Sequence, residues 1–277
     1  MCWRRLTALL LLTGNAAAAD GYIIGFGLEG DSADGLAASV IGDIALAENT
    51  WLSAAIARTT VNPPIIESLD TWYGDVGLDH WFDPMGVRLG VAYWGDNDIL
   101  DSVDLRGSLY WRWDRVTLAG DYEFRDFSLE FPTSGNFGGR SVDFNATGIG
   151  LTTRFQLTDK TSLGINGMNY DYSVGLGVDQ NRGILELLSS SRLSLISSLV
   201  DYRARVSLDH DAGEQRWQLE LATWKSEVDG GTTRSATIRL MAPMGESSDI
   251  EFGLGLDDSD LYGNVTFLSV FLYFYGD

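Results

Sequence analysis

Hydrophobic and polar residues alternate with a period of two through most of the chain. Between residues 103 and 114, Val103, Leu105, Leu109 and Trp111 occupy odd positions, and polar or charged residues fill the even ones. Residues 200–208 and 250–256 follow the same rule, and a helical period of 3.6 is not found. Because successive side chains of a β-strand point to opposite faces, each stretch predicts a strand with one apolar and one polar face.

Fourteen segments fit this description, and most are long enough to cross a bilayer as tilted strands, which takes roughly 9–11 residues. The sequence therefore predicts an all-β protein without a second layer. The predicted strands are 21–29, 36–46, 50–60, 70–82, 87–95, 103–113, 115–127, 143–157, 161–174, 197–209, 215–227, 232–242, 249–257 and 264–275.

The connections between these strands fall into two alternating classes. Tight turns predicted from the sequence are 48–49, 83–86, 114–115, 159–160 and 211–214, with 243–248 as the longest of this class. Longer connections are 61–69, 95–102, 128–142 and 175–196. Such alternation predicts that all short turns lie at one end of an antiparallel barrel and the longer loops at the other.

Tryptophan positions bear on whether this sheet crosses a membrane. Eight tryptophans follow the first nineteen residues, and all lie at ends of predicted strands. Two aromatic girdles at the membrane interfaces would produce this distribution, whereas a soluble β-sandwich would hold large aromatics in mid-strand. Trp51, Trp81, Trp111, Trp113 and Trp217 lie beside predicted short turns, and Trp72, Trp94 and Trp224 lie beside predicted loops.

The first nineteen residues have the features of a secretory signal peptide. Arg4 and Arg5 precede the apolar run 6–12, and the small residues 17–19 offer a cleavage site. A retained anchor helix is the alternative, but the apolar run is too short to span a bilayer. The only cysteine, Cys2, lies in this segment. We predict a signal peptide at 1–19 and one barrel domain at 20–277.

The chain resembles the Gram-negative outer-membrane β-barrels, and the monomeric porins in particular. The last predicted strand carries Ser269, Phe271, Tyr273 and Tyr275 on one face. This face is similar to the terminal aromatic signal that the barrel-assembly machinery recognises, although two residues follow it here. The resemblance implies a single closed antiparallel up-and-down transmembrane β-barrel of about fourteen strands in the bacterial outer membrane. It also implies outer-membrane lipid, lipopolysaccharide and the barrel-assembly machinery as partners.

The charged residues limit the partners of the protein and indicate which face of each strand lines the lumen. The chain has 39 acidic against 19 basic residues, a net charge of −20, which excludes nucleic acid as a partner. Charges facing hydrocarbon cost several kcal/mol each, so the polar faces are predicted to line a lumen. The candidate lumen and selectivity residues are Asp75, Asp104, Arg106, Asp121, Glu123, Arg125, Arg154, Asp201, Arg203, Arg205, Glu220, Arg239 and Glu251, and the wider predicted lumen set adds Asp43, Asp79 and Arg88.

Two interpretations of such a lumen follow from the sequence. In the first, the barrel is a channel for passive diffusion of small hydrophilic solutes, weakly cation-preferring because acids outnumber basic residues, and needs no cofactor. In the second, the barrel is closed and acts as an interaction protein through its external loops. Its wall would then be salt-bridged through pairs such as Asp104/Arg106, Glu123/Arg125 and Asp201/Arg203, or its lumen would be plugged. Residues 183–195 could form such a plug or a hydrophobic lid, or they could extend a strand above the membrane.

The last strand complicates both interpretations, because its second face is apolar as well. Leu268, Val270, Leu272 and Phe274 alternate with the aromatic face described above. Whichever face points inward, that part of the lumen contains apolar side chains. The sequence therefore predicts either a packed plug at the closing seam or a locally apolar lumen.

Catalytic chemistry has little support in the sequence. A barrel-embedded hydrolase is the third interpretation, and the triplet Asp209-His210-Asp211 resembles the acid/histidine pairing of outer-membrane proteases only weakly. The triplet falls in a predicted short turn, and His80 is the only other histidine. We expect no enzyme and assign no catalytic residue. Asp96 and Asp98 offer oxygen ligands but lack the glycine and distal glutamate of an EF-hand, so metal binding stays undetermined.

Overall fold

The computed structural model describes residues 21–61, 69–96, 99–131, 140–174, 199–228, 230–260 and 262–276. The predicted signal peptide at 1–19 and the predicted plug segment at 183–195 both lie outside these residues. No helix in the described part of the chain is long and apolar enough to cross a membrane.

Fourteen strands form, and each predicted strand overlaps one observed strand in the same order. The alternating pattern thus identifies every strand, and the ends differ by a few residues. The strands are β1 (Tyr22–Asp31), β2 (Leu36–Ala47), β3 (Thr50–Val61), β4 (Leu69–Phe82), β5 (Met85–Gly95), β6 (Leu100–Arg112), β7 (Val116–Phe131), β8 (Arg140–Thr158), β9 (Thr161–Tyr172), β10 (Val200–Ala212), β11 (Gln215–Ser226), β12 (Thr232–Gly245), β13 (Ser248–Ser259) and β14 (Gly263–Gly276).

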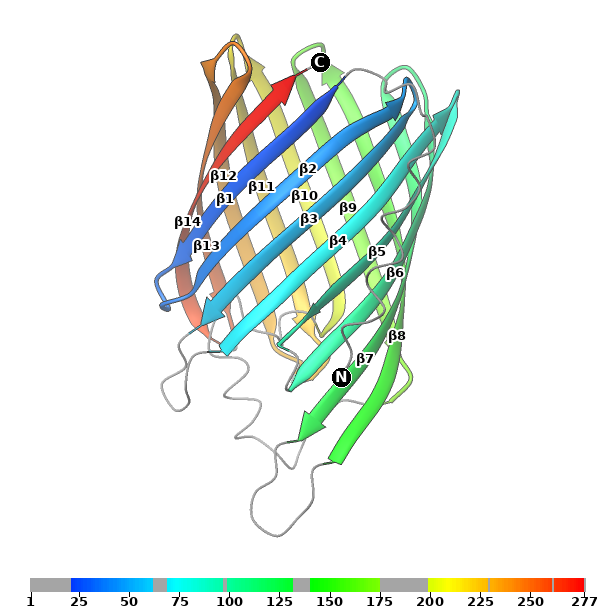
Figure 1. Ribbon diagram of the computed structural model, residues 1–277, viewed down its shortest axis with the longest axis vertical. Coiled ribbons are helices and arrows are strands. Elements are labelled where there is room, and N and C mark those ends of the chain that lie inside the picture. Colours follow the sequence, from blue (N-terminus) through cyan, green and yellow to red (C-terminus); the bar gives the residue numbers. More distant parts are fainter. Residues whose placement is uncertain are drawn as a thin grey trace.

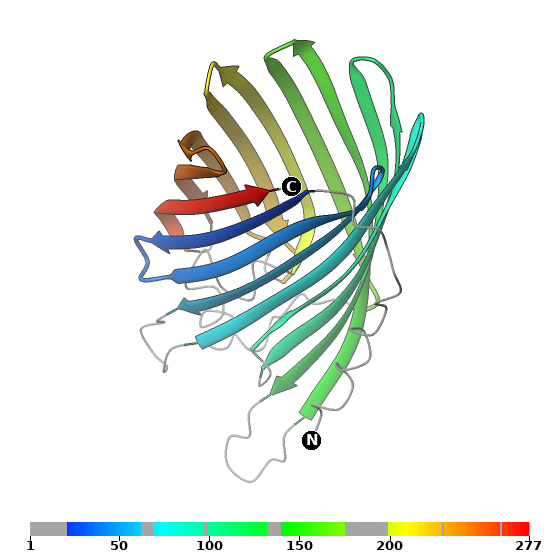
Figure 2. The same ribbon diagram turned by 45° about the horizontal axis from the view of Figure 1, so that its top comes forward.

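The strands close into a single barrel. Each strand pairs antiparallel with its neighbours in sequence, and β1 pairs with β14 from Tyr22↔Gly276 to Asp31↔Phe267. Closure leaves no free edge on which another chain could add a strand. Figures 1 and 2 show the tilted strands and the β1–β14 seam beside each other. The predicted closed antiparallel up-and-down barrel of about fourteen strands is confirmed.

Tight turns lie together at one end of the barrel, which we call the turn end; the opposite end is the loop end. The C-terminus also lies at the turn end (Figure 1, top). The turn expected over 243–248 is shorter than predicted, because β12 continues to Gly245 and β13 begins at Ser248. The longest strands, β7 and β8 with 16 and 19 residues, extend furthest toward the loop end.

The outer face of the barrel is apolar. Fourteen apolar residues that the alternation assigns to the lipid-facing side are each between 37% and 57% exposed, as hydrocarbon-facing side chains of a membrane barrel are when lipid is removed. On β7, β8 and β9 this apolar belt ends toward the loop end at the outward residues Asp126, Asn145 and Asn169. The exposed lipid-facing set is Ile24, Val40, Ile44, Val76, Leu78, Leu89, Val91, Leu118, Leu151, Ile165, Leu219, Leu221, Ile238 and Leu254.

The predicted aromatic girdles are half correct. By strand alternation Trp72, Trp111, Trp113 and Trp217 point outward, but Trp51, Trp81, Trp94 and Trp224 point into the lumen. Trp94, for example, is 7% exposed and packs edge-on against Phe127 at 6.1 Å between ring centroids. The position of a tryptophan along its strand sets only its depth in the membrane. Whether its side chain points to lipid or into the lumen depends instead on whether the residue occupies an outward or an inward position in the alternation of the strand.

Candidate functional site

The lumen contains a cavity of about 820 Å³ between strands that run around most of the barrel. Its wall combines charged groups with the aromatic side chains of Trp51 and Trp224. Acidic residues outnumber basic residues along it. The carboxylates are Asp43, Asp75, Asp79, Asp121, Glu123 and Glu220, and the guanidinium groups are Arg88, Arg106, Arg203 and Arg205.

The predicted lumen residues divide into those that line this cavity and those that support it. Asp104 and Arg125 point inward but are buried beneath the cavity wall, each about 5% exposed. Arg154, Arg239 and Glu251 also lie on inward-facing positions, outside the cavity lining. The seven predicted residues that line the cavity are Asp75, Arg106, Asp121, Glu123, Arg203, Arg205 and Glu220.

Asp201 is the exception among the predicted lumen residues. The register of β10 against β11 shifts between Val200 and Tyr202, and the Asp201 carboxylate lies 2.7 Å from the Lys225 Nζ at the loop-end rim. In the turn that follows β11, burial raises the pKa of Glu227, and the nearby Asp201 charge adds to this. Asp201 therefore belongs to an acidic rim, and its predicted place in the lumen wall is wrong.

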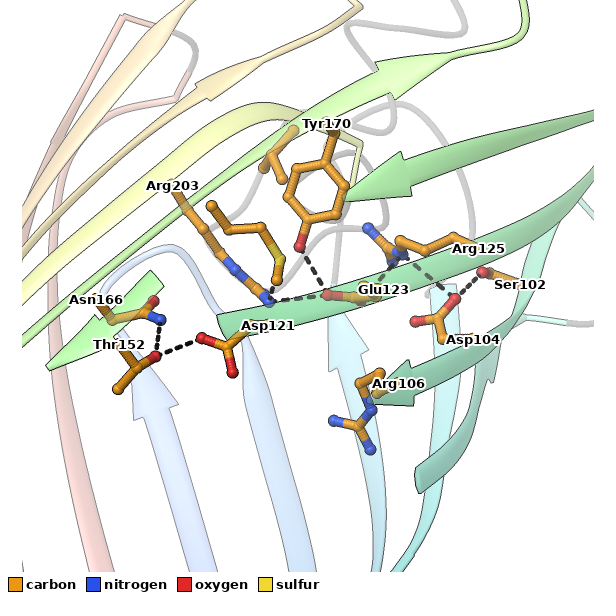
Figure 3. A network of polar contacts seen from close by, with 12 residues as sticks. Ser102, Asp104, Arg106, Asp121, Glu123, Arg125, Thr152, Asn166, Tyr170 and Arg203 are labelled. Carbon is orange, nitrogen blue, oxygen red and sulfur yellow. Dashed lines mark hydrogen bonds and ion pairs between the residues drawn. The ribbon is translucent and has the colours of Figure 1, made fainter. Parts of the chain in front are cut away.

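A buried ion-pair network forms the centre of the wall (Figure 3). The Arg125 Nε lies 3.3 Å from Asp104 Oδ1 and 3.6 Å from Glu123 Oε1. Its guanidinium also sits over the rings of Phe127 and Trp94, at 4.9 Å and 5.8 Å from their centroids. A buried cation needs such compensation, since its transfer from water costs several kcal/mol. Arg125 thus contacts both the carboxylates of Asp104 and Glu123 and the aromatic side chains of Phe127 and Trp94.

Glu123 carries the network from this buried centre to the open cavity. Its Oε2 accepts hydrogen bonds from the Tyr170 hydroxyl at 2.8 Å and from Arg203 Nη2 at 3.0 Å. The Arg203 side chain is 49% exposed, while that of Glu123 is only 6% exposed. Arg203 is therefore the member of the network that meets solvent in the lumen, as Figure 3 shows.

Several of these contacts skip a strand by crossing over a glycine. Tyr110 on β6 lies over Gly86 on β5, and its hydroxyl donates to Asp79 Oδ1 on β4 at 2.6 Å. Arg106 on β6 likewise passes Gly90 and pairs with Asp75 on β4. The missing side chain leaves room for a long group to lie flat along the wall.

A tyrosine that crosses a glycine also reaches Glu123. Tyr170 on β9 crosses Gly148 on β8, where an added Cβ would lie 2.7 Å from the ring, and so reaches Glu123 on β7. Sequence reasoning missed these bridging glycines. The sequence does contain a signal for them, because each is a glycine at an inward-facing position that pairs with a tyrosine or an arginine on the next strand. Flat side chains of this kind keep the centre of the lumen clear.

A third set of contacts covers the wall from β8 to β13. Glu220 Oε2 lies 3.6 Å from both Arg205 Nη1 and Arg239 Nη1, and Arg239 Nε lies 3.9 Å from Glu251 Oε1. Further toward the turn end, Arg154 Nη2 lies 3.4 Å from Asp209 Oδ2. The wall therefore carries a continuous ladder of opposite charges.

The pairings predicted from sequence are only partly correct. Glu123 and Arg125 do lie together, at 3.6 Å. Arg106 pairs with Asp75 rather than with Asp104, and Arg203 pairs with Glu123 rather than with Asp201. Residues two apart in one strand share a face and can meet, but the register also brings residues of neighbouring strands within reach. Long side chains such as those of Arg106 and Arg203 therefore find partners on other strands.

Two cavity carboxylates are left without a cation. All four arginines of the cavity wall have an acidic partner: Asp79 for Arg88, Asp75 for Arg106, Glu123 for Arg203 and Glu220 for Arg205. From the residues that the structure describes, the Asp121 carboxylate accepts one hydrogen bond, from the Thr152 hydroxyl at 2.6 Å, and it has no ion pair with any of them. The Asp43 carboxylate makes no hydrogen bond or ion pair with any residue that the structure describes. The cavity therefore carries uncompensated negative charge at Asp43 and Asp121.

Apolar groups fill the lumen in two places. At the loop end, a buried cluster forms from inward-facing residues of β3 to β8, including Val61, Leu100 and Phe144, together with Leu199 and Val228. At the seam, Phe267 lies over Gly255 and is 2% exposed. The predicted polar lumen does not extend to the loop end. At the seam, a locally apolar lumen, one of the two predicted alternatives, is observed. The face with Leu268, Val270, Leu272 and Phe274 points to lipid.

The histidines do not form a catalytic arrangement. His80 Nδ1 contacts the Thr50 hydroxyl at 2.8 Å, and His210 Nδ1 contacts the Thr161 hydroxyl at 3.0 Å, both on the outer face near the turn end. Asp209 and Asp211 flank His210 but point to the opposite face, as alternation requires. Among the described residues, no group of three or more His, Cys, Asp or Glu side chains could hold a metal ion.

Comparison with known proteins identifies the type of fold. No protein-family model and no curated protein sequence matches the chain. The chain is similar to OmpT, an outer-membrane protein of Vibrio cholerae in trimer form, with 8% identity over 93% of this chain and 98% of that one and a TM-score of 0.51. A loop-deletion mutant of the same protein gives 8% identity, 94% and 100% coverage and a TM-score of 0.53.

A porin is also among the similar structures. The KdgM porin, solved in complex with disordered oligogalacturonate, gives 10% identity over 91% of this chain and 98% of that one, with a TM-score of 0.47. At these identities the likeness is one of fold. The closed barrel and its apolar outer face define the chain as an outer-membrane β-barrel, similar in architecture to the outer-membrane proteins above.

Proposed function

We propose that this protein is a channel of the bacterial outer membrane through which small hydrophilic solutes diffuse passively, with a weak preference for cations. The observation that carries the proposal is the charged cavity of about 820 Å³ inside a closed barrel whose outer face is apolar. A volume of that size holds a few tens of waters, at about 30 Å³ each. The mechanism is steric and electrostatic filtering, without a chemical step.

The arrangement of the wall supports an open path. A fourteen-stranded barrel is wider than the eight-stranded size that side chains fill by themselves. Tyr110, Tyr170 and Arg106 lie along the wall over glycines instead of projecting into the centre. The ion pairs therefore stabilise the wall and leave water-filled space beside it.

The distribution of ion pairs supports the preference for cations. Since every arginine of the cavity wall is paired with a carboxylate, the unpaired charge at Asp43 and Asp121 sets the sign of the local potential. A low-dielectric wall strengthens that potential and raises the local concentration of cations.

A closed barrel acting through its external loops is the second candidate. The buried cluster at the loop end, with Val61, Leu100, Phe127 and Phe144 each 3% exposed or less, favours it because these side chains narrow the lumen there. Membrane lipid and lipopolysaccharide against the apolar belt, and the barrel-assembly machinery acting on β14, are proposed partners under either candidate.

Single-channel recording tests the proposal. The chain without residues 1–19 is refolded into planar bilayers, and the reversal potential is measured under a KCl gradient. Stable steps with a cation-selective reversal potential are expected. Replacing Asp43 and Asp121 together by Asn should bring the cation to anion permeability ratio close to one.

Asp201→Asn is the control for position, because it removes one carboxylate charge at the rim instead of in the cavity and should leave the ratio unchanged. A correctly folded protein that gives no conductance steps would contradict the channel and favour the closed barrel. A double variant with undiminished cation preference would contradict the role given to the two unpaired carboxylates.

A further inference from the structure

We propose that Asp43 and Trp51 form a binding subsite for small organic ammonium cations at the turn end of the lumen; this inference rests on the proposed channel function. Both residues line the cavity. The β2–β3 register pairs Asp43 with Ser53 and Ala45 with Trp51, so the carboxylate and the indole are diagonal neighbours on the inward face.

The Asp43 carboxylate has an apolar setting. Ile23 lies directly opposite on β1, and Ile41 and Ala45 flank it on its own strand, all facing inward. Ser53 opposite on β3 is the one polar side chain at this level. No described residue donates a hydrogen bond to the Asp43 carboxylate or forms an ion pair with it. Its charge is therefore available to a ligand.

The neighbouring charges do not neutralise Asp43. Asp79 lies opposite Trp51 on β4, and its two carboxylate oxygens are occupied by Arg88 Nε at 2.6 Å and by the Tyr110 hydroxyl at 2.6 Å. Asp75, on the same strand, forms an ion pair with Arg106. Arg88 and Arg106 thus already form ion pairs with aspartates of β4. Among the described residues, none forms an ion pair with Asp43 on this side of the cavity.

Trp51 supplies the second recognition element. Its side chain is 38% exposed, and the small residues Ala45 and Gly21 are its neighbours, with the Gly21 Cβ position 3.6 Å from the ring. Small neighbours leave much of the indole uncovered. Tryptophan is the aromatic side chain that attracts a cation most strongly through its ring face.

This combination selects the chemical class of the ligand. A hydrated inorganic ion could form an ion pair with the Asp43 carboxylate. It would, however, lose part of its hydration shell next to the apolar side chains of Ile23, Ile41 and Trp51. An alkylammonium ion can place its nitrogen on Asp43 and its methylenes on these apolar side chains, which removes apolar surface from water. Asp121 lacks such surroundings, because Thr152 and Asn166 lie beside it (Figure 3). Asp121 therefore suits hydrated ions.

Bi-ionic reversal potentials test the subsite, with n-butylammonium on one side of the bilayer and K⁺ on the other. In Trp51→Leu the permeability ratio of butylammonium to K⁺ should fall about threefold, the size of an exposed cation–π contact, while the K⁺ to Cl⁻ ratio stays constant. Asp43→Asn should lower both ratios. The matched control Asp121→Asn should lower only the K⁺ to Cl⁻ ratio.

Calorimetric titration of the micelle-refolded protein with n-butylammonium adds a readout that needs no conductance. Binding by the wild type that weakens in Trp51→Leu supports the subsite. No binding by the wild type, or equal effects of Asp43→Asn and Asp121→Asn on butylammonium, would overturn it. Absence of conductance in every variant would instead contradict the proposed channel, so the two failures are distinguishable. Heat-modified gel mobility verifies that each variant is folded.

Discussion

Arg125 combines roles that the sequence alone could not separate. It is a buried cation, and its contacts with Asp104, Glu123 and three aromatic rings compensate for its lost hydration. It also links the charged wall to the apolar cluster at the loop end. We infer that its main contribution is to the stability of the barrel, and that solutes meet Arg203 instead.

Replacing Arg125 by Met should destabilise the barrel by about 3 kcal/mol, because Asp104 would stay buried without a cation. Glu123 would keep Arg203 as its partner. Adding Asp104→Asn to Arg125→Met should recover part of this loss. Urea unfolding in lipid vesicles, followed by tryptophan fluorescence, measures the difference.

Arg203→Gln provides the comparison, since its side chain is half exposed and its removal should cost much less stability. If the free energies of unfolding of Arg125→Met and Arg203→Gln fell by the same amount, the buried position of Arg125 would not be what matters.

Side-chain partners were harder to predict than side-chain faces. The odd and even positions of β6 and β7 assigned Asp104, Arg106 and Glu123 to the lumen directly from the alternation. Their partners depend on the stagger between strands and on bridging glycines such as Gly90, and neither can be deduced from one strand at a time. Asp201 shows the same limit, because a one-residue register shift places it at the rim.

The strands themselves could be predicted because each carries its own signal. Period-two alternation, short turns and an apolar outer face agree along the whole barrel, and all fourteen strands appear in the expected order. For β14 the alternation left open which face points inward, because both faces are apolar. Its inward face is resolved by the neighbouring strands, whose glycines accept its rings: Gly27 on β1 lies under Phe271, and Gly255 on β13 lies under Phe267.

This seam makes a specific prediction for Gly255→Ala. The added Cβ would lie 2.0 Å from Phe267 Cζ, and Phe267 is only 2% exposed and cannot move freely. Overpacking of this kind costs about 1–3 kcal/mol. Gly27→Ala should cost less, because Phe271 is less buried than Phe267 and can rotate into the lumen. Both are measured by the same unfolding assay.

Gly120→Ala is the control for the seam, since nothing lies within 4 Å of its Cβ position. It should leave stability unchanged or slightly increased. A loss at Gly120 as large as that at Gly255 would mean that any alanine in these strands is harmful, and that the contact with Phe267 has no special effect.

The barrel as a unit has an uneven interior. Charged ladders cover the wall from β4 to β12, whereas aromatic side chains cover the seam, with Phe271 and Tyr273 stacked at 6.0 Å between ring centroids. Because most charges in the ladders are already paired, the potential that a passing ion feels arises from few groups. Selectivity should then be weak and easily screened.

Salt dependence tests this view of the lumen. The Debye length is about 10 Å at 0.1 M salt and about 3 Å at 1 M, so an ion near the axis should sense Asp43 and Asp121 in dilute salt and hardly at all in concentrated salt. We expect the K⁺ to Cl⁻ permeability ratio, from reversal potentials at a fixed twofold KCl gradient, to exceed one near 0.1 M and to approach one near 1 M. The preference of the Asp43–Trp51 subsite for butylammonium over K⁺ should weaken less, because it depends on direct contact as well as on charge. A K⁺ to Cl⁻ ratio that stayed constant over this range would mean that ions are selected by contact at a narrow constriction rather than by the field of the wall.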